Sequence, residues 1–203
     1  MDNYIMVSGN KIMLTEDQTK KIMEDYEIKQ KHLSDYAVGR TVMIGKFKFV
    51  VLDQQEGQTA LVLKGMYGEE TEFSRENNSY SGSYVDERCN TFARELSEVI
   101  GLENIVEHTV DLTSDDGMKD YGAVERHASL LTTDMYRKYV EILDTCKPGC
   151  WWWLATPHST ERHGNDRWIK CVAPSGNIDG SVYFNVNGVR PFCILKSNIF
   201  VSG

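Results

Sequence analysis

The sequence has few prolines, no excess of positive charge and no long apolar run. Only 4 of its 203 residues are proline, and 41% are hydrophobic, so its composition is that of a globular domain and not of a disordered or fibrous chain. Lys and Arg number 22 against 30 Asp and Glu, a formal net charge of −8. Because a surface that follows nucleic-acid phosphates needs a basic excess, this balance argues against direct nucleic-acid binding and against anionic membranes. It leaves open a partner that is itself basic.

We expect the protein to stay in the compartment in which it is made. No stretch approaches 18 apolar residues, and the N-terminus has neither a basic start nor an apolar run of signal length. Its five cysteines are an odd number, in a chain long enough to bury a core without disulfides. We therefore expect a cytoplasmic protein with reduced thiols.

Residues 1–35 are predicted to form a small separate module. Apolar segments at 4–7 and 11–14 flank a Gly-containing turn, which indicates a β-hairpin. Thr15 and Gln18 form a capping-box pattern that begins a helix, and helical spacing continues as far as Leu33. So small a unit cannot bury its apolar stripe alone. A second copy of the chain is one surface that would cover it, so we hypothesise a homo-oligomer through these residues.

Residues 39–203 are predicted to form one α+β domain. Alternating apolar residues over 47–63 predict a hairpin, and the apolar stripe over 86–100 predicts a helix. A further short helix is expected to begin at Thr133 and to be stopped by Lys147-Pro148-Gly149. The remainder is rich in aromatic and β-branched residues with frequent turns, which predicts an antiparallel sheet.

Few residues have the types and spacing of a chemical site. Cys146, Cys150, His158 and His163 are the only zinc-like set, but their spacing departs from a paired-cysteine knuckle, and the apolar segment between them would separate the two halves. We therefore predict no metal, with the cysteines packed as small hydrophobic residues.

Motifs for catalysis or for other ligands are missing as well. The acidic loop with Asp111, Asp115 and Asp116 lacks the alternate ligands and closing Glu of a calcium loop, which favours a solvated loop. The sequence contains no Gly-x-Ser-x-Gly elbow and no glycine loop for phosphate. We predict a noncatalytic protein without a cofactor.

Trp151 to Trp153 and the polar segment after them are the most unusual features. Because alternate strand residues point to opposite faces, at most two of the three tryptophans share a side. Burial between helices and sheet is the favoured interpretation, and an exposed stacking platform is the alternative. Residues 158–167 are a polar loop beside this strand, either a recognition surface or an ordinary solvated loop. Its candidate binding residues are His158, Arg162, His163, Asn165, Asp166 and Arg167.

The C-terminal half resembles a known family. Its motifs are Trp152-Trp153-Leu154-Ala155-Thr156-Pro157, then Val172-Ala173-Pro174-Ser175-Gly176-Asn177-Ile178, then Asn187-Gly188-Val189-Arg190-Pro191-Phe192. These motifs are similar to those of DUF6273, a family of unknown function common in gut Firmicutes and their phages. The resemblance covers about residues 39–200 and leaves residues 1–35 outside it.

This resemblance implies a C-type-lectin-like fold, with an antiparallel sheet and two helices. The fold is shared with formylglycine-generating enzymes and with the variable proteins of diversity-generating retroelements. It implies a scaffold role for Trp152 and Trp153, a buried fork of donors for Arg190 and relief of backbone crowding for Gly188. The paired cysteines of the enzyme branch do not align here. Diversified positions of this fold lie in its last strands and loops, which adds Asn177, Asp179, Tyr183, Asn185 and Asn187 to the candidate binding residues.

Three functions follow as hypotheses. The first is a noncatalytic recognition protein of phage, prophage or gut-bacterial origin that binds a protein or other macromolecular partner. The second is an acidic inhibitor, of the anti-defence or anti-CRISPR type, of a basic nucleic-acid-binding effector of the host. The third is an enzyme of the formylglycine-generating kind.

Overall fold

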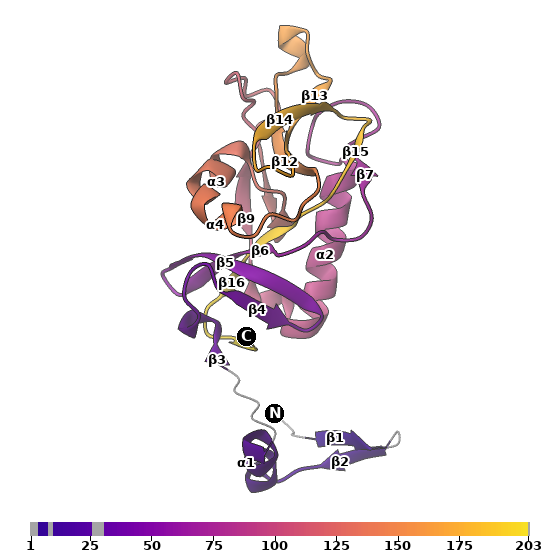
Figure 1. Cartoon of the computed structure of the whole chain (residues 1–203). Coiled ribbons are helices and arrows are strands. Elements are labelled where there is room, and N and C mark those ends of the chain that lie inside the picture. The colour runs from indigo at the N-terminus through magenta and orange to yellow at the C-terminus, as the bar shows by residue number, and fades with distance from the viewer. Residues whose placement is uncertain (1–3, 8–9, 26–30, 203) are drawn as a thin grey trace.

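The computed structural model describes residues 4–7, 10–25 and 31–202 (Figure 1). It contains antiparallel sheets and two main helical regions, which confirms the predicted α+β class. None of the described helices is long and apolar enough to cross a lipid bilayer.

The N-terminal hairpin and helix form where the sequence predicts them. Strands β1 (Tyr4–Val7) and β2 (Asn10–Met13) pair antiparallel, and α1 spans Glu16–Asp25. The capping box is present, because the Thr15 amide donates to Gln18 Oε1 at 3.0 Å and the Gln18 amide to Thr15 Oγ1 at 3.2 Å. The predicted continuation of the helix over residues 26–30 lies outside the described residues.

Residues 31–35, predicted to belong to this module, contact the main body. Strand β3 (Lys31–His32) pairs with β17 (Phe200–Val201), and a 3-10 turn, η1, spans Leu33–Asp35. The Leu33 side chain is fully buried in the core and is not part of a helical stripe. The chain therefore joins the main body several residues before the boundary predicted at residue 35.

A six-stranded antiparallel sheet forms the lower part of the body in Figure 1. Its strands follow the order β11 (Ala128–Ser129), β16 (Phe192–Lys196), β6 (Gln58–Leu63), β5 (Phe47–Gln55) and β4 (Thr41–Ile44), with β8 (Ile105–Val106) also paired to β16. The predicted β5–β6 hairpin turns through Glu56 and Gly57, which both have positive φ, 51° and 77°. Positive φ at both turn residues matches the twist of paired strands.

Helix α2 (Tyr84–Ile100) packs against one face of this sheet. Ser83 caps it by accepting from the Asp86 amide at 3.2 Å, and Gly101 ends it with a φ of 82°. Its buried stripe is the predicted one, except that Val99 is 49% exposed in the last turn.

A second, three-stranded sheet carries the aromatic segment. Its order is β12 (Trp152–Pro157), β13 (Trp168–Val172) and β14 (Ile178–Val182). Trp152 and Trp153 are buried on opposite sides of β12, Trp152 against Tyr136 and Trp153 against Phe73. Trp151 is 40% exposed. The favoured prediction, burial, is therefore confirmed for two of the three tryptophans.

Short elements complete the body. The predicted helix after residue 132 is broken at Tyr139 into α3 (Thr133–Lys138) and α4 (Val140–Asp144). Two pairs of short strands lie between the larger elements: β9 (His108–Asp111) with β10 (Ala123–Arg126), and β7 (Thr71–Glu72) with β15 (Val186–Asn187). Two 3-10 turns lie there as well, η2 (Leu102–Asn104) and η3 (Glu161–His163).

Arg190 is a buried fork of donors, as expected, whereas the space at Gly188 is limited first by the Met66 side chain and only then by backbone, the Trp151 carbonyl at 3.2 Å. Arg190 is 1% exposed; its Nε donates to the Leu63 carbonyl at 2.9 Å and its Nη2 to the Cys146 carbonyl at 3.1 Å. A side chain at Gly188 would place a Cβ 2.6 Å from Met66 Sδ. Arg190 therefore joins the end of β6 to the segment that follows α4, and Gly188 leaves room for the Met66 side chain.

Candidate recognition surface

The polar loop of residues 158–167 connects β12 to β13 and has a defined backbone. The His158 amide donates to the Trp168 carbonyl at 2.9 Å, which closes the loop at its base. Turn η3 lies at its tip and ends at Gly164, whose φ of 71° is a left-handed conformation that favours glycine. We call residues 158–167 the recognition loop.

Asn78 holds this loop from beneath. Its side chain is fully buried, and its Nδ2 donates to the carbonyls of Ser159 at 3.0 Å and Trp168 at 2.7 Å. Its Oδ1 accepts from the Tyr121 hydroxyl at 2.8 Å, and its amide donates to the Asp166 carbonyl at 2.9 Å. One asparagine thus satisfies polar groups at the beginning and the end of the recognition loop.

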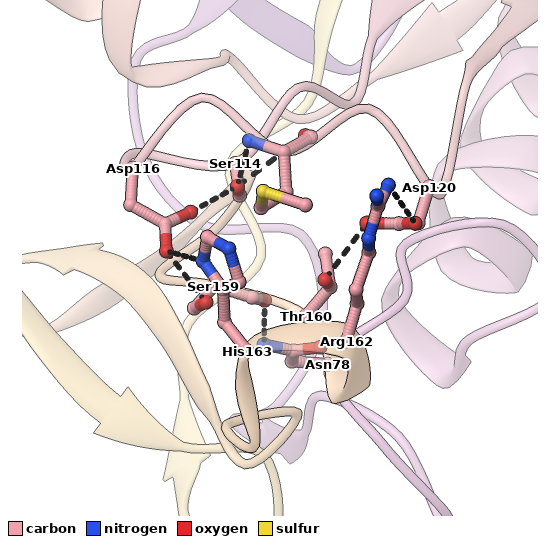
Figure 2. Close-up of polar contacts among 9 residues, drawn as sticks. Asn78, Ser114, Asp116, Asp120, Ser159, Thr160, Arg162 and His163 are labelled. Carbon is pink, nitrogen blue, oxygen red and sulfur yellow. Dashed lines mark hydrogen bonds and ion pairs between the residues drawn. The ribbon is translucent and has the colours of Figure 1, made fainter.

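Two carboxylates hold the loop from the side, as Figure 2 shows. Asp116 accepts from the Ser159 hydroxyl at 2.7 Å and lies 3.0 Å from His163 Nδ1. Asp120 accepts from the Thr160 hydroxyl at 2.9 Å, and its other oxygen lies 3.9 Å from Arg162 Nη1. Asp116 lies in the acidic loop that was predicted to be solvated and is exposed as predicted; with Asp120 it also forms the clamp of the recognition loop.

The electrostatics of Asp116 fit this role. Hydrogen bonds from the hydroxyls of Ser114 and Ser159, and then from His163, hold the pKa of Asp116 well below its usual range. The carboxylate is therefore ionised across the physiological range and remains a hydrogen-bond acceptor.

Most of the predicted loop residues keep their side chains at the surface. His158, Arg162, His163 and Arg167 are exposed, and Asn165 and Asp166 are half-buried. The Arg167 guanidinium lies 5.6 Å from the centre of the Phe184 ring. The backbone is therefore held while the side chains of His158 and Arg167 face solvent, and those of Arg162 and His163 are exposed beside Asp120 and Asp116.

The predicted residues from the last hairpin and the segment after it do not form one set. Asn177, Asp179 and Asn185 are exposed and Tyr183 is half-buried, whereas Asn187 is only 8% exposed on β15. Asn187 was predicted to be a binding residue. Because its side chain is buried, a partner cannot contact it in this conformation.

Trp168 is a surface residue that sequence reasoning missed. It is 44% exposed at the start of β13, and it lines a hollow of about 330 Å³ with His158, Asn165, Lys170, Ile178, Asp179 and Gly180. The only available signal was its place directly after the polar loop. The hollow joins the recognition loop to the β13–β14 hairpin.

Comparison with protein-family models, with curated proteins and with solved structures gives no match.

The cysteines and histidines singled out in the sequence have other contacts. Cys146 Sγ lies 3.3 Å from Arg190 Nη2, and His163 contacts Asp116. Within residues 4–7, 10–25 and 31–202, no three His, Cys, Asp or Glu side chains are grouped to hold a metal ion.

All five cysteines are free thiols, and three of them are buried. Burial raises the pKa of Cys89 and of Cys171 to about 12, and it raises that of Cys193 as well. A thiol must lose its proton to act as a nucleophile, so these three are unreactive at neutral pH.

Proposed function

We propose that this chain is a noncatalytic recognition protein. It binds a partner protein through the recognition loop and the neighbouring β13–β14 hairpin. The observation that carries the proposal is the contrast within the loop. A buried asparagine holds its backbone and two carboxylates hold its Ser159 and Thr160 hydroxyls, while the side chains of Arg162 and Arg167 are exposed. Side chains on a preordered backbone lose less conformational entropy on binding, which is the property of a recognition loop.

A C-type-lectin-like scaffold is part of this proposal. It is supported by the separate antiparallel sheet β12–β14, which carries the loop between its first two strands, and by the scaffold positions of Trp152, Trp153 and Arg190. An enzyme of the formylglycine-generating kind is disfavoured because the paired cysteines of that branch do not align with this sequence, and Cys89, Cys171 and Cys193 are buried.

The test is a loop variant with a matched control. Alanine replaces Arg162, His163, Asn165 and Arg167 together. The variant keeps Asn78 and the hydrogen bonds of Ser159 and Thr160 to Asp116 and Asp120, and it removes the contacts of His163 with Asp116 and of Arg162 with Asp120. Wild type and variant are used to capture partners from bacterial lysate, and binding of each captured protein is then measured with purified components. We expect the loop variant to lose the partner.

In the control variant, alanine replaces three exposed residues away from the recognition loop: Arg40, directly before β4, and Asn90 and Arg94 on α2. It changes the charge by the same two arginines and should retain the partner. A partner held equally by wild type and the loop variant would show that the recognition loop is not the binding surface.

A second candidate function, an inhibitor of a basic effector, has an observation of its own. Three carboxylates and one guanidinium line a hollow of about 360 Å³ beside the half-buried Tyr121, at the side of the same loop: Asp120, Glu161, Asp166 and Arg162. The negative charges of the carboxylates add to burial in raising the pKa of Tyr121. Binding steered by such carboxylates weakens steeply with salt. Affinity for the captured partner that is unchanged between low and high salt would count against this candidate.

A further inference from the structure

The outer edge of strand β14 is open. In the part of the chain that the structure describes, β14 pairs only with β13, in the register Lys170 to Gly180. The residues on either side of this ladder fix the hydrogen-bond pattern, because the Ala173 amide donates to the Asn177 carbonyl at 2.9 Å and the Tyr183 amide to the Arg167 carbonyl at 3.0 Å.

Hydrogen-bonded and non-bonded pairs alternate along an antiparallel ladder. Asp179 and Ser181 therefore direct their amides and carbonyls to β13, whereas Ile178, Gly180 and Val182 direct theirs outward. The Gly180 amide is consistent with this, since it donates to the Asp179 side chain at 2.7 Å and not to β13. The Val182 carbonyl already accepts from the Asn185 amide at 3.0 Å. The edge thus presents the amide and carbonyl of Ile178, the carbonyl of Gly180 and the amide of Val182, which is the template for an added strand.

A side-chain pocket opens on this edge. Gly180 has no Cβ, and the exposed Trp168 ring lies beside it, with a built Cβ 3.4 Å from Trp168 Cε3. The hollow that Trp168 lines with Ile178 lies over Gly180. An incoming strand that paired with β14 would place one of its alternate side chains in this hollow.

Charge selects the occupant. Lys170 in the hollow is neutralised by Asp115 at 2.8 Å, whereas Asp179 on the edge strand is exposed and forms no ion pair among the described residues. The whole chain carries −8. Pairing of β14 with a second copy would bring two such chains together and place two Asp179 carboxylates on neighbouring strands, which is unfavourable.

We propose that the free edge of β14 binds an extended cationic peptide segment of the partner protein as an added strand, with one bulky side chain in the hollow over Gly180. This inference rests on the proposed function, because it names the chemistry of the partner at the same surface. A lysine or arginine of the segment pairs with Asp179, which frees the Gly180 amide for the incoming carbonyl.

The experiment uses the full chain and synthetic peptides. The probe is an acetylated heptapeptide of alternating lysine and valine with leucine at its centre, and its analogues replace lysine by glutamate or the central leucine by proline. Fluorescence anisotropy gives affinities, and amide hydrogen exchange reports on Ile178 and Val182. We expect the lysine peptide alone to bind, and both amides to exchange more slowly when it does.

The decisive variant is Gly180→Val, which fills the hollow. A Cβ at this position makes ordinary contacts, and valine is a good strand residue, so the fold is retained. Gly65→Val, where nothing lies within 4 Å of the Cβ, is the control. We expect Gly180→Val to weaken peptide binding about tenfold, the effect of losing one buried anchor, and Gly65→Val to leave it unchanged.

Several results would overturn the inference. These are equal binding by the proline peptide, equal affinity of the two glycine variants, unchanged exchange at Ile178 and Val182, and a dimer of the free chain that protects these amides. Protection of the same amides by cellohexaose or chitohexaose in place of the peptide would assign the hollow to a sugar.

Partner capture that is lost in the loop variant but kept by Gly180→Val would leave the proposed function standing while the edge inference fails. Partner capture that is lost in Gly180→Val but kept by the loop variant would support binding at the β14 edge and would show that the recognition loop is not the binding surface.

Discussion

Replacing Asn78 by alanine tests whether one buried side chain holds the recognition loop in place. The change removes three side-chain hydrogen bonds, two to the carbonyls of Ser159 and Trp168 and one from the Tyr121 hydroxyl. The carbonyl of Trp168 keeps the His158 amide as a donor, and Tyr121 is only half-buried, so water can replace that partner. Ser159 is left with a buried carbonyl that has lost its donor.

The magnitude follows from these contacts. Hydrogen bonds contribute about 1 kcal/mol each, and an unsatisfied buried group costs about 1–3 kcal/mol. Asn78→Ala should therefore lower the free energy of unfolding by about 3 kcal/mol, with its effect centred on residues 158–167. The matched control is Asn77→Ala. That half-buried neighbour makes one side-chain bond, to the Ser79 amide at 2.9 Å, and its loss should cost about 1 kcal/mol or less.

Urea unfolding followed by tryptophan fluorescence measures the stability, and hydrogen exchange measures the loop. At a slope of about 2–3 kcal/mol per M, the midpoint of Asn78→Ala should fall by about 1–1.5 M. In the variant, hydrogen exchange should become faster than in wild type for the amides of the recognition loop, and by more than for the amides of β5 and β6. The reasoning would be refuted by a variant within about 0.5 kcal/mol of wild type, which is the range of surface substitutions.

Three further predictions concern the clamp and the scaffold. Because its hydrogen bonds lower the pKa of Asp116 below the unfolded value of about 3.9, its stabilisation is complete above that pH and is lost as the pH falls through the folded-state pKa. Loop exchange, corrected for the intrinsic pH dependence, should therefore be constant between about pH 5 and 7, and Asp116→Asn should raise it at pH 7; equal exchange in the variant would contradict this. Arg190→Met should lower the stability measured by thermal denaturation by about 2–4 kcal/mol, and Arg190→Lys should recover less than half, since lysine lacks the fork of donors. Gly188→Ala should cost about 1–3 kcal/mol through its contact with Met66, and adding Met66→Ala should recover part of it; purely additive effects would place the strain elsewhere.

Local patterns in the sequence determined much of the secondary structure. The capping box at Thr15 and the turn at Gly57 are formed by residues adjacent in the chain, so short-range chemistry fixes them. Opposite orientation of Trp152 and Trp153 follows from the period of two in a strand. The break at Tyr139 was not predictable in this way, because the apolar spacing continues through it.

The sequence by itself determined the α+β class, the buried aromatic strand and the polar loop that follows it. Only the tertiary structure decided that Asn78 and Asp116, about 80 and 40 residues away from that loop, hold it, and that Asn187 is buried while Trp168 is exposed. The physical reason is that side-chain hydrogen bonds between distant segments depend on the path of the chain and leave no local pattern in the sequence. The composition of the acidic loop predicted its exposure, which is confirmed, whereas its contacts with the recognition loop are decided by the fold.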